Sequence, residues 1–209
     1  MKRLITFFSA FILSLTISAQ EYWDGARPDH RFTFGIRVGG NVSKIFDDDG
    51  YNGKYRIGFQ VGATADINIV RSLSFNTGVF YIQKGYKIEV KGKPGEVVKF
   101  DCHPAYIEIP FLLSYRVKLS DAAQFQLNVG PYFSCGIKAS DREFFGESNS
   151  YDYNLYDYKK NDLGISAGAA ITYEHLYAGV NYERSIKSIN NSDTKSYNSS
   201  IVVSLGYNF

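Results

Sequence analysis

The sequence predicts an all-β fold, an eight-stranded antiparallel up-and-down transmembrane β-barrel. Apolar and polar residues alternate through eight segments, which is the period of a strand with one apolar and one polar face. The connections between these segments are alternately long and short, as they are in outer-membrane barrels. An export signal precedes the segments, and no later window approaches the ~20 apolar residues that a membrane-spanning helix needs. Such a chain can cross a bilayer only as a closed barrel, because lipid offers its backbone no hydrogen-bond partners.

The amino terminus has the layout of a secretory signal peptide. Lys2 and Arg3 are followed by an apolar stretch over residues 4–17, and Ser18 and Ala19 precede the expected cleavage point. No cysteine follows that point, which argues against a lipid-anchored form. The expected organisation is a signal peptide at residues 1–19, a lead-in without periodicity at residues 20–31 and the barrel domain at residues 32–209.

The first half of the barrel domain contains four predicted strands, at residues 32–42, 55–69, 73–88 and 103–117. In the first, Phe, Ile and Val alternate with Thr, Gly and Arg, and the other three repeat this pattern with their own apolar and polar sets. Their connections are a polar loop at residues 43–54, a tight turn at residues 70–72 and a second polar loop at residues 89–101.

The second half of the barrel domain contains four more predicted strands, at residues 124–134, 163–172, 176–183 and 196–209. They are joined by turns at residues 118–122 and 173–175 and by loops at residues 139–162 and 188–195, of which the first is the longest in the chain. The even number of strands places both ends of the domain on the short-turn side.

Composition narrows the class of protein. The chain has 209 residues and a net charge of +2, which gives no basic surplus for nucleic acid. Its 17 Tyr, 16 Phe and 19 Gly suit β-structure with many turns and aromatic girdles at the two membrane interfaces. Cys102 and Cys135 fall on strands expected to be neighbours, which would allow one disulfide, but strict alternation puts them on opposite faces and argues against it.

The final strand has the form of a barrel-assembly signal. Large apolar residues occupy every second position up to an aromatic carboxyl terminus, namely Ile201, Val203, Leu205, Tyr207 and Phe209. This pattern resembles the signal by which the barrel-assembly machinery handles outer-membrane proteins. The alternative is an ordinary edge strand of a soluble sandwich.

The inward face carries charge. Its ionisable residues are Arg37, Asp66, Lys84, Glu108, Arg116 and Glu183. An eight-stranded barrel is filled by its own side chains, so these charges must pair in a nearly dry lumen. We expect an internal salt-bridge network that includes Glu108 and either Arg37 or Arg116. The functional alternative is a proton or ion path, whereas a general diffusion porin needs about 16 strands.

No cofactor, metal or catalytic site is predicted. His30 and His175 belong to the short-turn end and His103 to the opposite end, so neither a multi-histidine metal site nor a Ser-His-Asp set converges. The run Asp47-Asp48-Asp49-Gly50 departs from a calcium-binding EF-hand in its spacing, which favours a solvated loop.

One segment suggests binding. The longest loop carries six aromatic residues among acids and amides: Phe144, Phe145, Tyr151, Tyr153, Tyr156 and Tyr158. Exposed aromatic rings at this density suit contact with a protein or glycan partner. The alternative is that they pack on the barrel rim or continue the adjacent strands above the membrane.

Several segments together resemble a known family. They are FGIRVGGNVSKI at residues 34–45, GFQVGATADINI at 58–69, LSFNTGVFYIQKG at 73–85, YIEIPFLLSY at 106–115, LNVGPYFSCGIKA at 127–139, NDLGISAGAAI at 161–171 and SLGYNF at 204–209. In this order they resemble the PorT-like outer-membrane β-barrel family of Gram-negative bacteria. The resemblance implies an eight-stranded barrel inserted by the barrel-assembly machinery. The family is named for a member linked to a protein secretion system, a role that fold alone does not transfer.

The functional hypothesis is an outer-membrane barrel with a structural or surface-interaction role and no catalytic activity. Its expected surroundings are outer-membrane lipid, the assembly machinery during insertion and a protein or glycan at the extracellular loops, with no nucleic acid. The first alternative is an accessory membrane component of a secretion or assembly complex. A barrel enzyme and a soluble ligand-binding barrel are the remaining alternatives.

Overall fold

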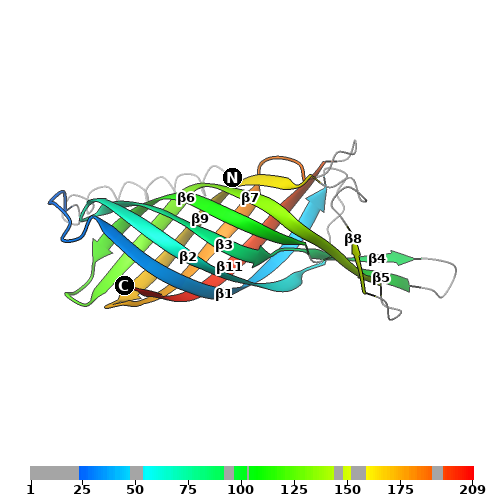
Figure 1. Cartoon of the computed structure of the whole chain (residues 1–209), viewed down its shortest axis with the longest axis horizontal. Helices are drawn as coiled ribbons and strands as arrows, with labels where there is room; N and C mark the ends of the chain where they lie inside the picture. The colour runs from blue at the N-terminus through cyan, green and yellow to red at the C-terminus, as the bar shows by residue number, and fades with distance from the viewer. Residues whose placement is uncertain are drawn as a thin grey trace, which may run out of the picture.

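The computed structural model describes residues 24–47, 54–91, 97–102, 104–143, 148–151, 159–189 and 195–209. Eight antiparallel strands in this part of the chain form a closed barrel (Figure 1), which confirms the predicted fold class. The barrel strands are β1 (Phe32–Asp47), β2 (Arg56–Val70), β3 (Leu73–Gln83), β6 (Ala105–Lys118), β7 (Ala123–Glu143), β9 (Asn161–Tyr173), β10 (Leu176–Ser185) and β11 (Ser196–Asn208).

Pairing between the first and last strands closes the barrel. The register of β1 against β11 runs from Gly35 opposite Asn208 to Asp47 opposite Ser196. On the other side of the circuit, β6 pairs with β7 and β7 pairs with β9. Each of the eight strands therefore has two neighbours, and no backbone edge faces outward, as a bilayer requires.

The two ends of the barrel differ. At the short-turn end, β2–β3, β6–β7 and β9–β10 are joined by tight connections, and Phe209 lies beside the start of β1, where its amide donates to the Phe34 carbonyl. Glu174, in the β9–β10 turn, adopts a left-handed conformation with φ of 52°, as tight hairpins require. The opposite end, with the long connections, is called the long-loop end.

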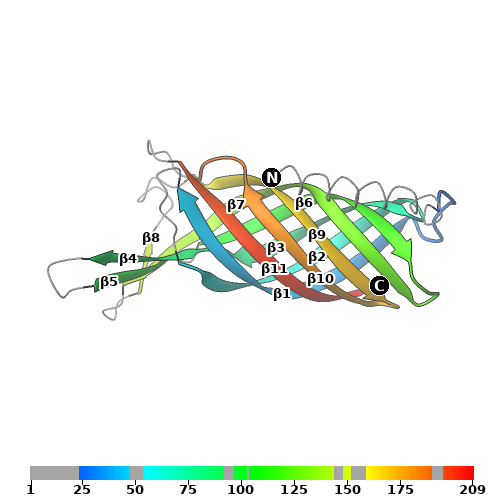
Figure 2. The same cartoon turned by 180° about the vertical axis from the view of Figure 1, so that it is seen from behind.

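Three short strands lie beyond the barrel wall at the long-loop end (Figures 1 and 2). They are β4 (Tyr86–Lys91), β5 (Val97–Cys102) and β8 (Ser148–Tyr151). β4 and β5 form a hairpin, and the end of β7 pairs with both β5 and β8. The barrel ladder thus continues as a small sheet outside the membrane span.

This small sheet corrects the expected loops. The predicted third strand, residues 73–88, is in fact β3 and the start of β4, and the predicted loop at residues 89–101 contains most of the hairpin. Likewise, β1 and β7 extend into the expected loops at residues 43–54 and 139–162. The polar composition of these segments suggested loops, but a strand outside lipid needs no apolar face because its backbone bonds come from neighbouring strands.

Exposure alternates along the strands. On β11, Ile201, Val203 and Leu205 are 50–62% exposed, whereas Ser200, Val202 and Ser204 are at most 3% exposed. The same contrast recurs around the barrel, giving an apolar outer belt and a largely polar lumen. None of the described residues forms a helix long and apolar enough to cross a membrane.

Candidate functional site

The centre of the lumen is crossed by an ion-pair cluster around Lys84. β3 ends at Gln83, but the Lys84 amide still donates to the Pro104 carbonyl at 3.2 Å, beside the start of β6. Ser43 of β1 makes two hydrogen bonds of 2.8 Å with the Gly85 backbone. Lys84, 1% exposed, places its Nζ 2.5 Å from Glu108 Oε2 on β6 and 2.9 Å from Glu183 Oε2 on β10. One ammonium group therefore joins carboxylates from separate parts of the wall.

Neighbouring side chains complete this cluster. Ser134 Oγ donates to Glu108 Oε2 at 2.7 Å, and Ser200 Oγ donates to Glu183 Oε2 at 3.1 Å. The Lys84 ammonium lies 4.2 Å from the centre of the Tyr132 ring, a cation–π distance. Each charged group thus has several partners, which offsets the cost of its burial.

A second cluster lies nearer the short-turn end. Arg116 Nη2 pairs with Asp66 Oδ2, and Arg116 Nη1 donates to Asn68 Oδ1 at 2.6 Å. The second carboxylate oxygen of Asp66 accepts a hydrogen bond from the amide of Asn76. These residues come from β2, β3 and β6, which are adjacent in the wall.

Arg37 belongs to neither cluster. Its guanidinium group lies 3.9 Å from the centre of the Tyr177 ring, and Nη2 donates to Asn208 Oδ1 at 2.6 Å. Nη1 donates to the carbonyls of Ile36 and Tyr207 at 3.0 and 3.3 Å. This arginine therefore ties the closing strand to β1 and β10.

All six predicted lumen residues lie inside the barrel, but their pairing differs from the expected network. The structure joins Lys84, Glu108 and Glu183 in one cluster and Asp66 with Arg116 in another. Glu108 pairs with Lys84 and not with an arginine. Alternation identifies the face of each residue but not its neighbour on a distant strand, so it could not choose between these partners.

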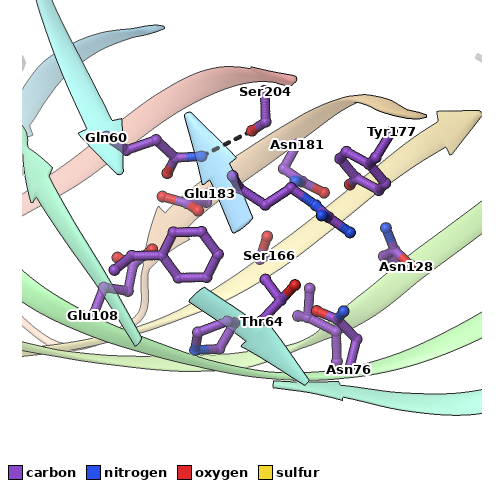
Figure 3. Close-up of a pocket in the computed structure, with 14 residues that line it drawn as sticks. Gln60, Thr64, Asn76, Glu108, Asn128, Ser166, Tyr177, Asn181, Glu183 and Ser204 are labelled. Atoms are coloured by element: carbon purple, nitrogen blue, oxygen red, sulfur yellow. Dashed lines mark hydrogen bonds between the residues drawn. The ribbon is translucent and has the colours of Figure 1, made fainter. Parts of the chain in front are cut away.

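Apolar side chains help to fill the lumen near the Lys84 cluster, whereas the lumen is open toward the short-turn end. Two buried apolar clusters occupy the part toward the long-loop end: Ile45, Tyr86 and Ile189 in one, and Ile82, Tyr106 and Val202 in the other. A cavity beside the Lys84 cluster has a volume of about 40 Å³, enough for a few water molecules. Glu108 and Glu183 line it together with Gln60, which donates to Ser204 Oγ at 2.8 Å (Figure 3).

The lead-in folds over the short-turn end. Asp24 N donates to Ser72 Oγ at 2.7 Å, and Ser72 N donates back to the Asp24 carbonyl at 3.1 Å. Arg71 pairs with Asp24 at 3.5 Å and with Asp29 at 3.3 Å. The lead-in thereby helps to line a cavity of about 740 Å³ at this mouth. At its rim, the ion pair and hydrogen bond with Lys118 lower the pKa of the exposed Asp121 carboxyl.

A family comparison identifies the barrel. The family model described as "Outer membrane protein beta-barrel domain" matches residues 18–191, which is most of the chain. The chain belongs to this family. It is therefore a protein of the outer membrane, and its apolar outer belt faces lipid.

Several solved outer-membrane proteins match the chain at low identity and with TM-scores below 0.5. Ail, the attachment invasion locus protein of Yersinia pestis, is 15% identical, with a TM-score of 0.44 over 86% of this chain and 100% of Ail. OprG of Pseudomonas aeruginosa is 14% identical, with a TM-score of 0.46 over 90% of this chain and 99% of OprG. Neisserial surface protein A is 13% identical, with a TM-score of 0.44 over 84% of this chain and 97% of that protein. A search of the curated proteins finds no match.

The other predicted site residues are distributed as follows. Tyr151 is the last residue of β8, while Phe144, Phe145, Tyr153, Tyr156 and Tyr158 lie outside the described residues, as does the signal peptide. The outward residues of the final strand are 41–70% exposed, and the Tyr207 and Phe209 rings meet edge to face at 5.5 Å. Cys135 is a free cysteine whose backbone lies opposite Ile107 of β6.

The histidines are separate in the part of the chain that the structure describes. His30 is exposed, and its carbonyl accepts a hydrogen bond of 2.7 Å from Asn68 Nδ2. His175 Nδ1 lies 2.8 Å from the Asn208 carbonyl, and its ring stacks on Tyr207 at 5.3 Å. His103 is not among the described residues. Across those residues, no group of three or more His, Cys, Asp or Glu could hold a metal ion.

The sequence argument missed two features, a contact of Lys84 and a pair of outward cations. Lys84 was assigned to the lumen, but alternation along one strand could not show that it contacts Glu108 on β6 and Glu183 on β10 together. Lys44 and Arg184 were not singled out, although both have the parity of the outward apolar residues. The available signal was that Lys44 and Arg184 both fall on the lipid-facing side of the alternation, close to the end of a predicted strand.

Proposed function

We propose that this outer-membrane barrel acts through its surfaces, as a structural or surface-interaction protein without catalytic activity. The observation that carries the proposal is the Lys84 cluster, which crosses the lumen between β6 and β10. Together with the two buried apolar clusters, this arrangement fills much of the lumen among the described residues, which supports a role other than solute passage. The charged groups Lys84, Glu108 and Glu183 are engaged with one another, which favours a structural role over contact with a substrate.

Conductance measurements test this proposal. The purified, folded protein in planar bilayers should produce no stable conductance steps. A variant with Lys84→Ser, Glu108→Ser and Glu183→Ser removes the central cross-link and should show more frequent openings. Replacement of the exposed Lys118 by Ser is the matched control. Stable steps from the wild-type protein would contradict a surface role and favour an ion path.

The partner, a protein or glycan, is assigned to the long-loop end. The sheet of β4, β5 and β8 extends the barrel outward there. In the sequence, the aromatic residues Phe144, Phe145, Tyr151, Tyr153, Tyr156 and Tyr158 fall between β7 and β9. A photo-crosslinking residue at position 151 in intact cells should yield discrete adducts. The same residue at position 119, in the β6–β7 turn, is the control and should not yield them.

The PorT-like resemblance supports a second candidate, an accessory membrane component of a secretion or assembly complex. The feature that favours it is the short-turn end, where the lead-in and three turns surround the 740 Å³ cavity. Native gel migration of the gently solubilised protein distinguishes the two roles. A stable complex that dissociates when residues 24–31 are deleted would support the accessory role, whereas migration as a single barrel would count against it.

Export and assembly complete the proposal. We infer that the signal peptide at residues 1–19 is removed and that the barrel-assembly machinery recognises the final strand. Mass measurement of the mature protein tests cleavage before Gln20. Deletion of Phe209, which is 70% exposed, should lower the outer-membrane yield more than its small contribution to folded stability would explain.

A further inference from the structure

A row of polar side chains interrupts the apolar outer surface near the long-loop end. Lys44 of β1 and Arg184 of β10 both lie opposite Ser199 of β11, so the three residues are neighbours across adjacent strands. In the next row toward the short-turn end, Val42 and Tyr182 both lie opposite Ile201, and all three are 41–50% exposed. The cations therefore follow directly on the apolar belt, on its lipid-facing side.

Aromatic rings bring the two cations together. Lys44 Nζ lies 3.9 Å from the centre of the Phe46 ring and 4.8 Å from that of Tyr55. The Arg184 guanidinium carbon lies 5.6 Å from the same Phe46 ring, so this ring is shared by both charges. Cations and aromatic rings at this level are typical of the membrane interface, where long side chains direct their charge toward headgroups.

Among the side chains that the structure describes, no carboxylate pairs with Lys44 or Arg184, and both basic groups lie beside an apolar surface. Ser199 Oγ is occupied in donating to Tyr182 Oη at 3.1 Å. The strand spacing places the backbones of Lys44 and Arg184 about 10 Å apart, two interstrand distances, with Ser199 between them. This is a span that one anionic headgroup can bridge.

The charges described near Lys44 and Arg184 also favour an anionic ligand. Among side chains whose placement is described, the exposed acids are all at the short-turn end: Asp24, Asp29, Asp121 and Glu174. The exposed ionisable side chains described near the long-loop end are all basic: Lys54, Lys159, Lys160, Arg184, Lys187 and Lys195. Among the side chains that the structure describes, the charge near Lys44 and Arg184 is therefore positive, which suits an anionic headgroup.

We propose that Lys44 and Arg184, with Phe46 and Tyr55, form a binding site for the phosphate-bearing headgroup of an anionic lipid in the outward leaflet. The two cations hold the phosphate oxygens, and the apolar row of Val42, Ile201 and Tyr182 packs against the acyl chains. The occupant is a lipid because the site is continuous with the lipid-facing belt. This inference depends on the location in the outer membrane and not on the proposed surface role.

Retention of diphosphorylated lipid A by the folded protein in detergent, measured by native mass spectrometry, tests the site. The variant Lys44→Gln with Arg184→Gln should retain lipid A about thirtyfold less well, since each of the two basic groups removed contributes about 1 kcal/mol near an anionic surface. Arg31→Gln with Lys118→Gln is the matched control, because it removes one exposed arginine and one exposed lysine at the opposite end. Exchange of the two cations, Lys44→Arg with Arg184→Lys, should restore retention.

Several outcomes would overturn the proposal. Equal losses in the two neutralised pairs would mean that net charge, and not this site, attracts the lipid. Competition by millimolar inorganic phosphate would make it a site for a soluble anion. Heat-modifiable gel mobility verifies folding of each variant, and the single variant Arg184→Gln, at an exposed position, gives a second measurement. Unchanged retention in folded Arg184→Gln and in the folded double variant would exclude the site.

Discussion

Charged side chains on the inner and outer faces of the barrel wall have different surroundings. Glu183 and Arg184 are consecutive on β10, yet Glu183 points inward to Lys84 and Ser200, whereas Arg184 points outward beside Phe46. Inside, charged groups meet groups of opposite sign from other strands. Outside, Lys44 and Arg184 share an aromatic ring and have no described carboxylate partner. The surroundings of each side chain, rather than its charge, therefore decide whether it stabilises the barrel or contacts the membrane.

This contrast has an energetic basis. The Lys84 cluster is buried from bulk water, so an ionised group there must have protein partners or lose several kcal/mol. At the membrane boundary a long side chain can reach water or a headgroup, so lack of a protein partner costs little. Substitutions that remove inner partners should thus affect stability, and those in the outer row should affect lipid binding.

The largest effect is expected at Lys84. Its replacement by Met leaves Glu108 and Glu183 buried without their cation and should lower the free energy of unfolding by about 3–5 kcal/mol. Urea unfolding in lipid vesicles measures the change. The triple variant Lys84→Met, Glu108→Gln and Glu183→Gln should recover part of the loss because no charge remains unpaired. A single variant as stable as wild type would show that the cluster does not stabilise the lumen.

Placing a charge in the outer belt should have the next largest effect. Val203, near the middle of β11, is 56% exposed and pairs with Gly40 and Val180. Val203→Arg should destabilise the barrel by about 2–4 kcal/mol in a bilayer, the cost of a lipid-facing Arg near the midplane. Leu119→Arg is the matched control, because Leu119 is equally exposed at 59% but lies in a turn. Equal effects at both positions would contradict the location of the belt.

Replacement of Arg116 compares a charge near the mouth of the lumen with the more deeply buried Lys84. Its side chain is 14% exposed and borders the 740 Å³ cavity, so water can replace part of what it contributes. Arg116→Met should therefore cost about 1.5–3 kcal/mol, the range for hydrogen bonds to charged groups and below the loss at Lys84. A double-mutant cycle with Asp66→Asn measures their coupling directly. Coupling near zero would mean that solvent screens this pair completely.

Most of the barrel could be predicted because one periodicity determines both fold and face. The alternation around Arg37, Asp66 and Glu108 assigns each residue to the lumen without reference to any other strand. The partners could not be predicted in this way, since alternation does not show which side chains meet across the lumen, as Lys84 meets Glu108 of β6 and Glu183 of β10. The extramembrane sheet was missed for a related reason, because strands outside lipid need no apolar face to form.

The smallest effect is expected where charge is exposed at the short-turn end. Arg71 is half-exposed and pairs with Asp24 and Asp29 at 3.5 and 3.3 Å, so Arg71→Ala should lower global stability by less than about 1 kcal/mol. The backbone bonds from Arg71 and Ser72 to the lead-in remain, so loss of the ion pairs should appear as local opening. Faster hydrogen exchange of these two amides, with unchanged exchange in β11, is the expected result. Arg27→Ala, an exposed substitution within the lead-in, serves as the control. Because exposed ion pairs are screened, 0.5 M salt should reduce the difference between wild type and Arg71→Ala, and a difference that persists would mean that Arg71 contributes through packing instead.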